Sequence, residues 1–516
     1  SNPANPVINI RSYGEDPELV AKLGAAFIRG AQETGVMATA KHFPGHGDTA
    51  VDSHLALPVM NMDRQRLDAL ELIPFKKAIQ TGVWSVMTAH LAVPALEPDT
   101  RIPATLSDKV LGGLLQKELG FSKLVVTDSL TMAALAEGYW AGDAALRAFK
   151  AGVDVLLDSP NPDAVYQSLL QAVRSGDVSR KRLDHSVRKI LEAKVWLGLH
   201  RKRRVDLQRV NKVVSDPKLQ EQAQQMADGS VTIVRDQSGV LPLDVRPVRS
   251  AHAVMVVSRD QGEETGVFER ELRERLDSVS FDRLWTSSSE HDLETALEKA
   301  RRAEVIVCAI FARVVTGTGT VGLPEKLAKW VEELSQVKRP LATVALGTPY
   351  VIQGFPALST YLCTFSNADV SQTAAVRALF GEIPVTGKLP VTLPGVAAIH
   401  SGVERERSAM ILRSPAPSES APVQGRLQRI LDPLMEEQIG KRAFPGAALA
   451  VGYRGTLLFQ KGYGKLDYSS KAPAVTNETI YDLASLTKVI TATTLAMQLY
   501  ERGQLKLEHP VSRYFP

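Results

Sequence analysis

Residues 15–40 read EDPELVAKLGAAFIRGAQETGVMATA, and this stretch contains the alternation that decides the fold. Acidic residues open it, and Leu19, Leu23 and Phe27 recur at a spacing of four, which predicts a helix with one apolar face that ends near Gly35. The apolar run VMATA that follows is typical of a short buried strand. A helix followed directly by a strand is the repeating unit of an α/β fold.

The same alternation continues to about residue 200. Helical patterns such as SDKVLGGLLQKELGF separate three further apolar runs that predict strands: VWSVMTAH at 83–90, KLVVTDS at 123–129 and VDVLLDS at 153–159. Apolar strands between amphipathic helices indicate a parallel sheet that is covered on both faces.

Polar residues collect where these strands end: Lys41, His42, His90, Asp128 and Asp158. Side chains from several strand ends that meet at one face are typical of a (β/α) TIM barrel. A complete barrel has eight strands, and only four or five are readable in this sequence. We therefore expect a barrel over residues 1–200 that is incomplete at its N-terminus.

Length and composition indicate a multidomain globular protein. The 516 residues exceed the roughly 300 that one hydrophobic core organises. The net charge of +4 is small for this length, so we expect no nucleic-acid partner. No apolar stretch approaches the ~20 residues of a membrane span. Cys308 and Cys363 lie in apolar strand-like runs, which predicts core thiols.

Three further regions follow the predicted barrel. The basic run HRKRR at 200–204 is typical of a solvated linker, and residues 216–396 predict a second α/β domain with a mostly parallel sheet. Its strands are AHAVMVVS, EVIVCAIFA, PLATVALG and TYLCTFS. Residues 397–424 include SPAPSESAPVQG and predict a linker. Residues 425–516 predict an α+β segment with a hairpin that turns at YRGT, followed by a helix near SLTK.

The loop KHFPGHGDTAVDSH at 41–54 carries the most chemistry. Asp128, at the end of its strand, suits a nucleophile, a metal ligand or a helix cap. Asp52 and His54 suit an oriented proton donor, because a carboxylate beside an imidazole favours the protonated ring, or else a loop hydrogen bond. Zinc bound by His42, His46 and His54 is a third interpretation, but no HExxH or cysteine cluster supports it, and we expect no metal and no cofactor.

Two shorter motifs have weaker support. GTGTVG at 317–322 fits a dinucleotide fingerprint, but Pro324 starts the next helix too late and no acidic residue ends the next strand, so a surface loop is favoured. Ser485 and Lys488 in SLTK lie one helical turn apart, where a lysine activates a serine for acyl transfer or the two simply share an exposed face.

The loop motif resembles the signature of glycoside hydrolase family 3, in its β-N-acetylglucosaminidase branch. NPVINIRSYGEDPE, PATLSDKVLGGLLQKELGF, VVTDSLTM and GEIPVTGKLPVTLP match the same family in the same order, over residues 1 to about 396. The resemblance implies that Asp128 is the nucleophile, that His54 is the general acid/base and that Asp52 is the partner of His54. It also implies that Arg11, Lys41 and His42 bind the sugar.

The chemistry of these residue types agrees with the resemblance. Retaining hydrolysis needs a nucleophile on one face of the sugar and a proton donor near the leaving oxygen. Here a histidine replaces the usual second carboxylic acid, on a glycine-rich loop that suits motion after the substrate binds. Without a second anionic carboxylate at the water site, we also hypothesise that phosphate competes with water for the intermediate.

The last ninety residues resemble the opening of class C β-lactamases and related penicillin-binding-protein esterases. FPGAALAVGYRGTLLFQKGYGKLD and the run from TIYDLASLTK to the end carry this likeness. It implies that Ser485 is a nucleophile and Lys488 its base partner. The later tyrosine and Lys-Thr-Gly-type motifs of that family have no counterpart before Pro516, so we expect this segment to be inactive as given.

The function expected is a retaining exo-β-N-acetylglucosaminidase that releases terminal β-linked GlcNAc from peptidoglycan fragments. Its partner is then a small amino-sugar glycoside, and two modules directed at the cell wall favour the envelope or periplasm. Three alternatives stay open. The first is a serine acyl hydrolase with a glycan-binding barrel. The second is a β-glucosidase, which the DSH motif disfavours. The third is a catalytically inactive scaffold.

Overall fold

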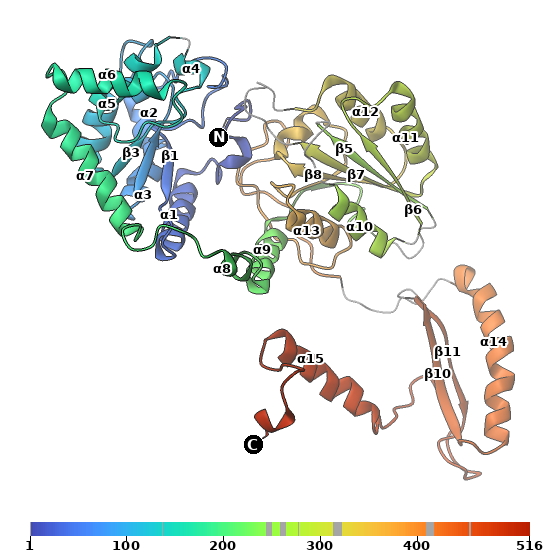
Figure 1. Ribbon diagram of the computed structural model, residues 1–516. Coiled ribbons are helices and arrows are strands. Elements are labelled where there is room, and N and C mark those ends of the chain that lie inside the picture. Colours follow the sequence, from blue (N-terminus) through green and yellow to red (C-terminus); the bar gives the residue numbers. More distant parts are fainter. Residues whose placement is uncertain are drawn as a thin grey trace. The chain divides into compact units, whose positions relative to one another are not determined.

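The computed structural model describes residues 2–515 except 137, 244–249, 259–264, 277, 313–321, 409–416 and 454–455 (Figure 1). The chain divides into two compact units, residues 1–408 and residues 409–516. Most of the GTGTVG motif and the centre of the YRGT turn lie outside the described residues. No helix among the described residues has both the length and the apolar character that crossing a membrane requires.

The first part of the larger unit contains a parallel three-stranded sheet with the order β1-β2-β3. Its strands are β1 (Thr39–Phe43), β2 (Ser85–Thr88) and β3 (Leu124–Val126). The predicted strand at 153–159 contributes only an isolated parallel bridge between Val126 and Val155. The parallel α/β arrangement is thus present, with three regular strands where the sequence predicted four.

Helices pack around this sheet. They are α1 (Pro17–Glu33), α2 (Arg64–Ala69), α3 (Leu72–Gln80), a π-helix (Lys109–Glu118), α4 (Ala133–Ala136), α5 (Ala141–Ala151), α6 (Pro162–Arg174) and α7 (Arg180–Trp196). Their apolar residues and those of the strands form one core, which includes Phe43, Val86, Leu115 and Val125.

The predicted apolar face of α1 is wrong. Ala21, Ala25 and Ile28 are buried, whereas Leu23 is 38% exposed and Phe27 is 62% exposed. α1 packs against α3, and small alanine side chains permit a close approach of two helices, so the larger residues lie on the other face.

A buried ion cluster holds α7 to the strand segment at 153–157. The carboxylate of Asp154 is fully buried and accepts hydrogen bonds from Lys189 Nζ at 2.9 Å and from the backbone N–H of Val125 at 3.1 Å. Ser186 and Arg182 complete the set. Because the ammonium of Lys189 is also almost fully buried, each charge depends on the other.

The second part of the larger unit is a six-stranded sheet with the order β4-β9-β8-β7-β5-β6. The strands are β4 (Thr232–Asp236), β5 (Ala251–Val257), β6 (Val279–Leu284), β7 (Val305–Ala312), β8 (Leu341–Gly347) and β9 (Thr360–Cys363). All neighbours are parallel except β4, which runs antiparallel to β9. The four predicted strands are present, and β4 and β6 are additional.

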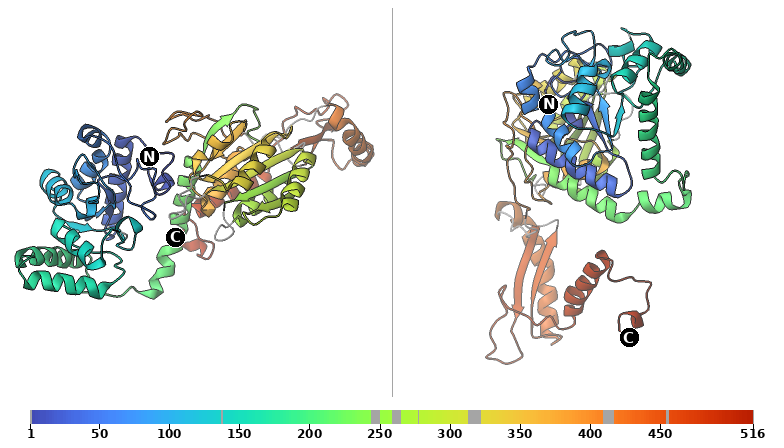
Figure 2. Two further views of the ribbon diagram at one scale, coloured as in Figure 1. Left: turned by 90° about the horizontal axis from the view of Figure 1, so that it is seen from above. Right: turned by 90° about the vertical axis from the view of Figure 1, so that its left-hand side faces the viewer.

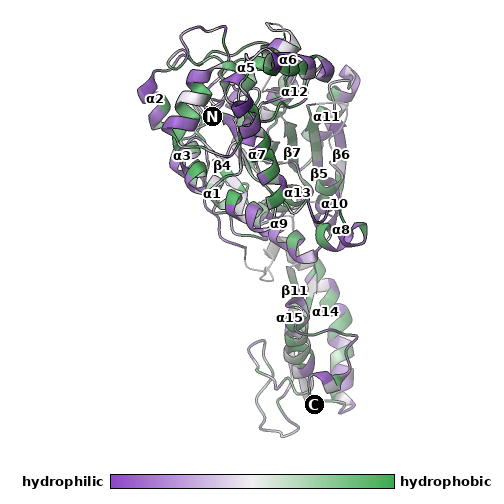
Figure 3. Ribbon diagram, turned by 60° about the vertical axis from the view of Figure 1, so that its left-hand side comes forward, coloured by the Kyte–Doolittle hydropathy of each residue, from purple (hydrophilic) through white to green (hydrophobic). Residues whose placement is uncertain are grey.

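Helices cover both faces of this sheet (Figure 2). Val254 and Val256 of β5 pack with α11 (Glu290–Arg302) and α12 (Glu325–Ser335), whereas Ala253 and Met255 pack with α10 (Gly266–Arg275) and α13 (Asp369–Leu379). β5 and β7 are hydrophobic along their length (Figure 3), as strands buried on both faces must be. Cys308 and Cys363 are buried free thiols, which confirms the prediction of core cysteines.

The segments between the sheets include α8 (Leu207–Val214) and α9 (Pro217–Ser230), and HRKRR is exposed as predicted. The carboxylate of Glu15 accepts a hydrogen bond from the backbone N–H of Thr392 at 2.9 Å, and the backbone N–H of Glu15 donates to Pro390 O at 3.0 Å. Two of the family-like sequence segments, GED and LPVT, therefore meet in space.

The predicted linker at 397–424 is too long. Val403 and Arg405 pair with Ile233 and Val385 in the larger unit, and α14 (Pro417–Gly440) already includes the end of the predicted linker. Apolar residues at helical spacing after residue 426 nucleate this helix, and it extends back over the Pro/Ser-rich residues.

The smaller unit contains α14 and the predicted hairpin of β10 (Gly446–Tyr453) and β11 (Thr456–Gly464). Asp432 of α14 accepts hydrogen bonds from Lys461 at 2.7 Å and from Tyr463 at 2.8 Å, which fastens the helix to β11. The predicted helix after SLTK forms a π-helical turn (Lys488–Thr493) and α15 (Thr494–Glu501).

The Asp154 cluster gives a test of this packing. Asp154→Asn removes a buried negative charge and leaves the buried Lys189 uncompensated, so we expect a loss of about 3 kcal/mol in the free energy of unfolding. Asp177→Asn is the control, because Asp177 is half exposed in its pair with Lys150 and such pairs contribute less than about 1 kcal/mol. Urea unfolding followed by tryptophan fluorescence measures both, and equal losses would contradict the assignment.

Candidate active site

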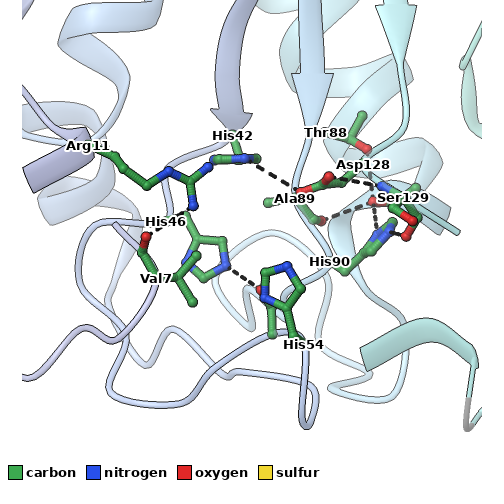
Figure 4. Close-up of polar contacts among 12 residues, drawn as sticks. Val7, Arg11, His42, His46, His54, Thr88, Ala89, His90, Asp128 and Ser129 are labelled. Carbon is green, nitrogen blue, oxygen red and sulfur yellow. Dashed lines mark hydrogen bonds and ion pairs between the residues drawn. The ribbon is translucent and has the colours of Figure 1, made fainter. Parts of the chain in front are cut away.

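The carboxyl ends of β1, β2 and β3 bring the predicted site residues to one edge of the sheet (Figure 4). Lys41 and His42 lie at the end of β1, His90 follows β2, and Asp128 follows β3. The loop at 44–54 then carries His54 to the same edge, and Asp52 is bonded to His54. Parallel strands present all their carboxyl ends on one side, so residues far apart in the sequence meet there.

Asp128 is held as a partly exposed carboxylate. Its Oδ2 lies 3.5 Å from Nε2 of His42, and its Oδ1 accepts a hydrogen bond from the backbone N–H of Ser129 at 2.9 Å. The side chain is 21% exposed. The backbone donor and the contact with His42 orient the carboxylate, and part of the side chain stays exposed.

His42 is a neutral neighbour of this carboxylate. Burial lowers the pKa of His42 to about 3, although the carboxylate of Asp128 beside it acts in the opposite direction. The ring is 7% exposed, and its Nδ1 has no hydrogen-bond partner among the described residues. The neutral ring therefore contacts Asp128 without adding a charge.

Asp52 and His54 form a hydrogen-bonded pair. Oδ1 of Asp52 accepts from Nδ1 of His54 at 2.8 Å and from the backbone N–H of His54 at 2.9 Å. Asp52 is 1% exposed at its side chain and His54 is 36% exposed. Because a carboxylate only accepts, the proton of this bond lies on Nδ1, and Nε2 is the atom available to a ligand.

His46 does not join His42 and His54 in a metal site. Its Nε2 lies 3.0 Å from Ser53 Oγ and its Nδ1 lies 3.2 Å from Thr49 Oγ1, so both ring nitrogens already have partners. Among the residues that the structure describes, no three His, Cys, Asp or Glu side chains are arranged to hold a metal ion.

His90 and Asp158 hold the segment that follows Asp128. Nε2 of His90 lies 2.9 Å from the carbonyl oxygen of Ser129, which only accepts, so the ring donates there. Nδ1 lies 2.8 Å from Thr105 Oγ1, and burial lowers the pKa of His90. Ser129 Oγ in turn donates to Asp158 at 2.7 Å. Both strand-end residues therefore fix the backbone around the carboxylate of Asp128.

Arg11 and Lys41 border the site on the side of β1. Arg11 donates to the carbonyl oxygen of Val7 at 3.0 Å, and Figure 4 shows its guanidinium beside the rings of His42 and His46. Lys41 is exposed. Both residues and His42 line a cavity of about 510 Å³ that also contacts α1 and α3, whereas Asp128 and His54 are not among its lining residues.

Four residues of this region escaped the sequence analysis: Asn5, Thr49, Ser53 and Thr105. Asn5 is fully buried, and its Nδ2 donates to the carbonyl oxygen of His46 at 2.8 Å and to Thr49 Oγ1 at 3.2 Å. The signal in the sequence was the position of Asn5 in the largely apolar stretch NPVINI. An amide that is buried there needs hydrogen-bond partners, so its presence indicates a polar network nearby.

The second predicted pair lies in the smaller unit. Lys488 Nζ donates to Ser485 Oγ at 2.9 Å, and both residues are exposed. The two side chains share one face, as their spacing predicted. In this contact the lysine nitrogen is the donor, whereas activation of the serine would require the same nitrogen to accept the hydroxyl proton.

Comparisons with known protein families match two separate parts of the chain. Residues 1–193 match the family model of the glycosyl hydrolase family 3 N-terminal domain, and residues 427–516 match the β-lactamase model. The chain is similar to β-hexosaminidase A of Pseudoalteromonas piscicida, with 28% identity over 439 residues, 76% of this chain and 72% of the relative.

Two further relatives are more similar over the matched residues. A β-N-acetylglucosaminidase/β-glucosidase of Cellulomonas fimi is 36% identical over 46% of this chain and 44% of its own length. The solved structure of a glycoside hydrolase family 3 β-N-acetylglucosaminidase from Paenibacillus sp. str. FPU-7 is 34% identical, with a TM-score of 0.69, over 76% of this chain and 74% of that chain. This chain thus spans less than half of the Cellulomonas relative.

The low pKa of His42 predicts how stability depends on pH. The pKa is about 6.5 in the unfolded chain and about 3 in the folded protein, so unfolding at pH 5 takes up a proton at His42. The contribution of neutral His42 to the free energy of unfolding is complete above pH 6.5, and it is lost as the pH falls toward 3.

The slope of the unfolding free energy against pH measures how many protons the chain takes up when it unfolds. Between pH 4 and 6, His42→Gln should therefore reduce this uptake by almost one proton. His200→Gln is the control, because His200 is exposed in the HRKRR run. Urea unfolding at a series of pH values measures both slopes, and an unchanged slope in His42→Gln would show that His42 is already protonated in the folded protein.

Proposed function

Since the chain belongs to glycoside hydrolase family 3, we propose that it is a retaining exo-β-N-acetylglucosaminidase that removes terminal β-linked GlcNAc from peptidoglycan fragments. The observation that carries this proposal is the meeting of an oriented carboxylate, Asp128, and a carboxylate-paired imidazole, His54, at one edge of a parallel sheet. Retaining glycosidases require a nucleophile on one face of the sugar and a proton donor near the leaving oxygen.

Asp128 is the proposed nucleophile. Its carboxylate attacks the anomeric carbon, forms a glycosyl ester and displaces the aglycone oxygen. The contact with His42 and the hydrogen bond from the backbone N–H of Ser129 support this role, because they orient the carboxylate and leave part of it exposed.

His54 is the proposed general acid/base, with Asp52 as its partner. Nε2 gives a proton to the leaving oxygen, and the same nitrogen then takes a proton from the water that attacks the glycosyl ester. Asp52 accepts the hydrogen bond from Nδ1 and so orients the ring with Nε2 free for the substrate. Asp52 is almost fully buried, which strengthens that interaction.

Arg11, Lys41 and His42 are the proposed sugar-binding residues. They border the site on the side of β1, and the two cations are exposed and offer several N–H donors to hydroxyl groups. His42 would have two roles, because its ring already contacts Asp128.

The parallel β/α arrangement and the match to the Paenibacillus structure support a further proposal, that β1, β2 and β3 are strands of a (β/α)8 barrel. We also propose that residues 1–200 and 216–396 act together as the glycosidase, since Glu15 contacts Thr392. Peptidoglycan is proposed as the source of the substrate because a β-lactamase-like domain follows in the same chain. An envelope or periplasmic location would follow from that source.

The leaving group of the substrate tests the role of His54. His54→Ala should slow glycosides with poor leaving groups by about 10²-fold or more, while a dinitrophenyl glycoside, which leaves without a proton, changes little. Values of kcat/KM for a series of aryl β-GlcNAc substrates measure this, with His185→Ala as an exposed control. Equal losses across the series would mean that His54 has a structural role.

A substrate panel separates the alternatives. The proposal predicts turnover of aryl β-GlcNAc above aryl β-glucose and its loss by at least about 10³-fold in Asp128→Asn, with no change in Ser485→Ala. Hydrolysis of nitrocefin that Ser485→Ala abolishes would favour the serine acyl hydrolase instead, for which the Lys488–Ser485 contact is the supporting observation. Added phosphate tests the second step, because a sugar phosphate product identifies phosphorolysis.

A further inference from the structure

We propose that Ser53 is a positioning residue that holds the loop of His54 against the segment that carries Asp128. The inference rests on the proposed role of His54 as the proton donor. Ser53 lies between the two members of the pair, Asp52 and His54, and is 1% exposed. Its side chain and its backbone contact different parts of the site.

The side chain of Ser53 ends a buried series of hydrogen bonds. Asn5 Nδ2 donates to Thr49 Oγ1, which lies 3.2 Å from His46 Nδ1, and His46 Nε2 lies 3.0 Å from Ser53 Oγ. Asn5, His46 and Thr49 are each at most 4% exposed. Buried polar groups that satisfy one another are costly to separate, so this series is a fixed anchor.

His46 supplies its bond to Ser53 as a neutral ring. Burial lowers the pKa of His46, which keeps the ring uncharged near neutral pH. If Thr49 donates to Nδ1, the ring proton lies on Nε2 and donates to Ser53 Oγ. Asn5, Thr49 and His46 then each use a donor and an acceptor, and Ser53 Oγ accepts the last bond.

The backbone of Ser53 contacts the other side of the site. Its carbonyl oxygen accepts a hydrogen bond from the backbone N–H of Ala134 at 3.4 Å. Ala134 lies in α4, which begins five residues after Asp128. Ser53 is therefore a direct link between the loop of the proposed proton donor and the segment of the proposed nucleophile.

Most residues at the tip of the loop, residues 50–56, are not buried and so do not hold it in place. Ala50, Val51, Leu55 and Ala56 are exposed, and Val51 and Leu55 are 44% and 50% exposed. Asp52 and Ser53 are the buried residues of the stretch 50–56. Loss of the bond at Ser53 Oγ should therefore release the tip of the loop, with its histidine, rather than unfold the domain.

Ser53→Ala tests the inference. We expect a loss of about tenfold in kcat/KM for aryl β-GlcNAc substrates with poor leaving groups and less than about twofold for good ones, since only the former need the proton. Ser85→Ala is the matched control, because Ser85 is a buried serine of β2 whose hydroxyl has no partner among the described residues. Its removal should change neither value.

Hydrogen exchange supplies a readout that does not depend on turnover. In Ser53→Ala the amides of residues 50–56 and 130–136 should exchange faster, whereas in Ser85→Ala they should not. A combined His46→Leu and Ser53→Ala variant should be no worse than the more severe single variant, because both remove the same bond.

The outcomes separate this inference from the proposed function. If His54→Ala shows the leaving-group dependence and Ser53→Ala slows all substrates equally, with exchange unchanged, the inference is wrong and the function stands. If His54→Ala itself shows no such dependence, the proposed function fails first. Faster exchange together with a loss confined to poor leaving groups would support Ser53 as the positioning residue.

Discussion

The contact between His42 and Asp128 joins the first and the third strand of the parallel sheet, and the geometry of the site depends on it. His42 ends β1 and Asp128 follows β3, so β2 lies between them and the two side chains meet beyond its end. Only a parallel arrangement brings residues 42 and 128 to one edge through short strands and crossover helices. The buried pair of Asp154 and Lys189 fastens α7 beside the same sheet.

The site combines a carboxylate that is held in place, Asp128, with an imidazole on a partly exposed loop, His54. Asp128 is oriented by the backbone N–H of Ser129 and by its contact with His42, and His90 and Asp158 fix the segment around it. His54 instead lies on a loop whose outer residues are exposed and whose inner residues are buried. A nucleophile needs a constant position, whereas a proton donor has to approach a bond that is present only after the substrate binds. The fixed segment around Asp128 suits the first task, and the partly exposed loop of His54 suits the second.

Much of this arrangement was readable from the sequence, because long apolar strands and their polar ends are strong signals. The four central strands of the six-stranded sheet and the two core cysteines follow from hydrophobic runs. β4 and β6 were missed because edge strands such as TIVRD and VSFDRL mix charged and apolar residues. The buried face of α1 was wrong, since size alone favoured Leu23 and Phe27 over Ala21 and Ala25. Asn5 and Ser53 were missed because their importance comes from partners over forty residues away, His46 for Asn5 and Ala134 of α4 for Ser53.

The most direct measurement of the central claim is the identification of the residue that becomes covalently attached to the sugar. A fluorinated aryl GlcNAc analogue that forms the glycosyl ester quickly and hydrolyses it slowly would be incubated with the protein, followed by proteolysis and peptide mass spectrometry. The account predicts one added sugar on the peptide that contains VVTDSLTM, located at Asp128. A sugar attached to any other carboxylate, or to Ser485, would contradict it.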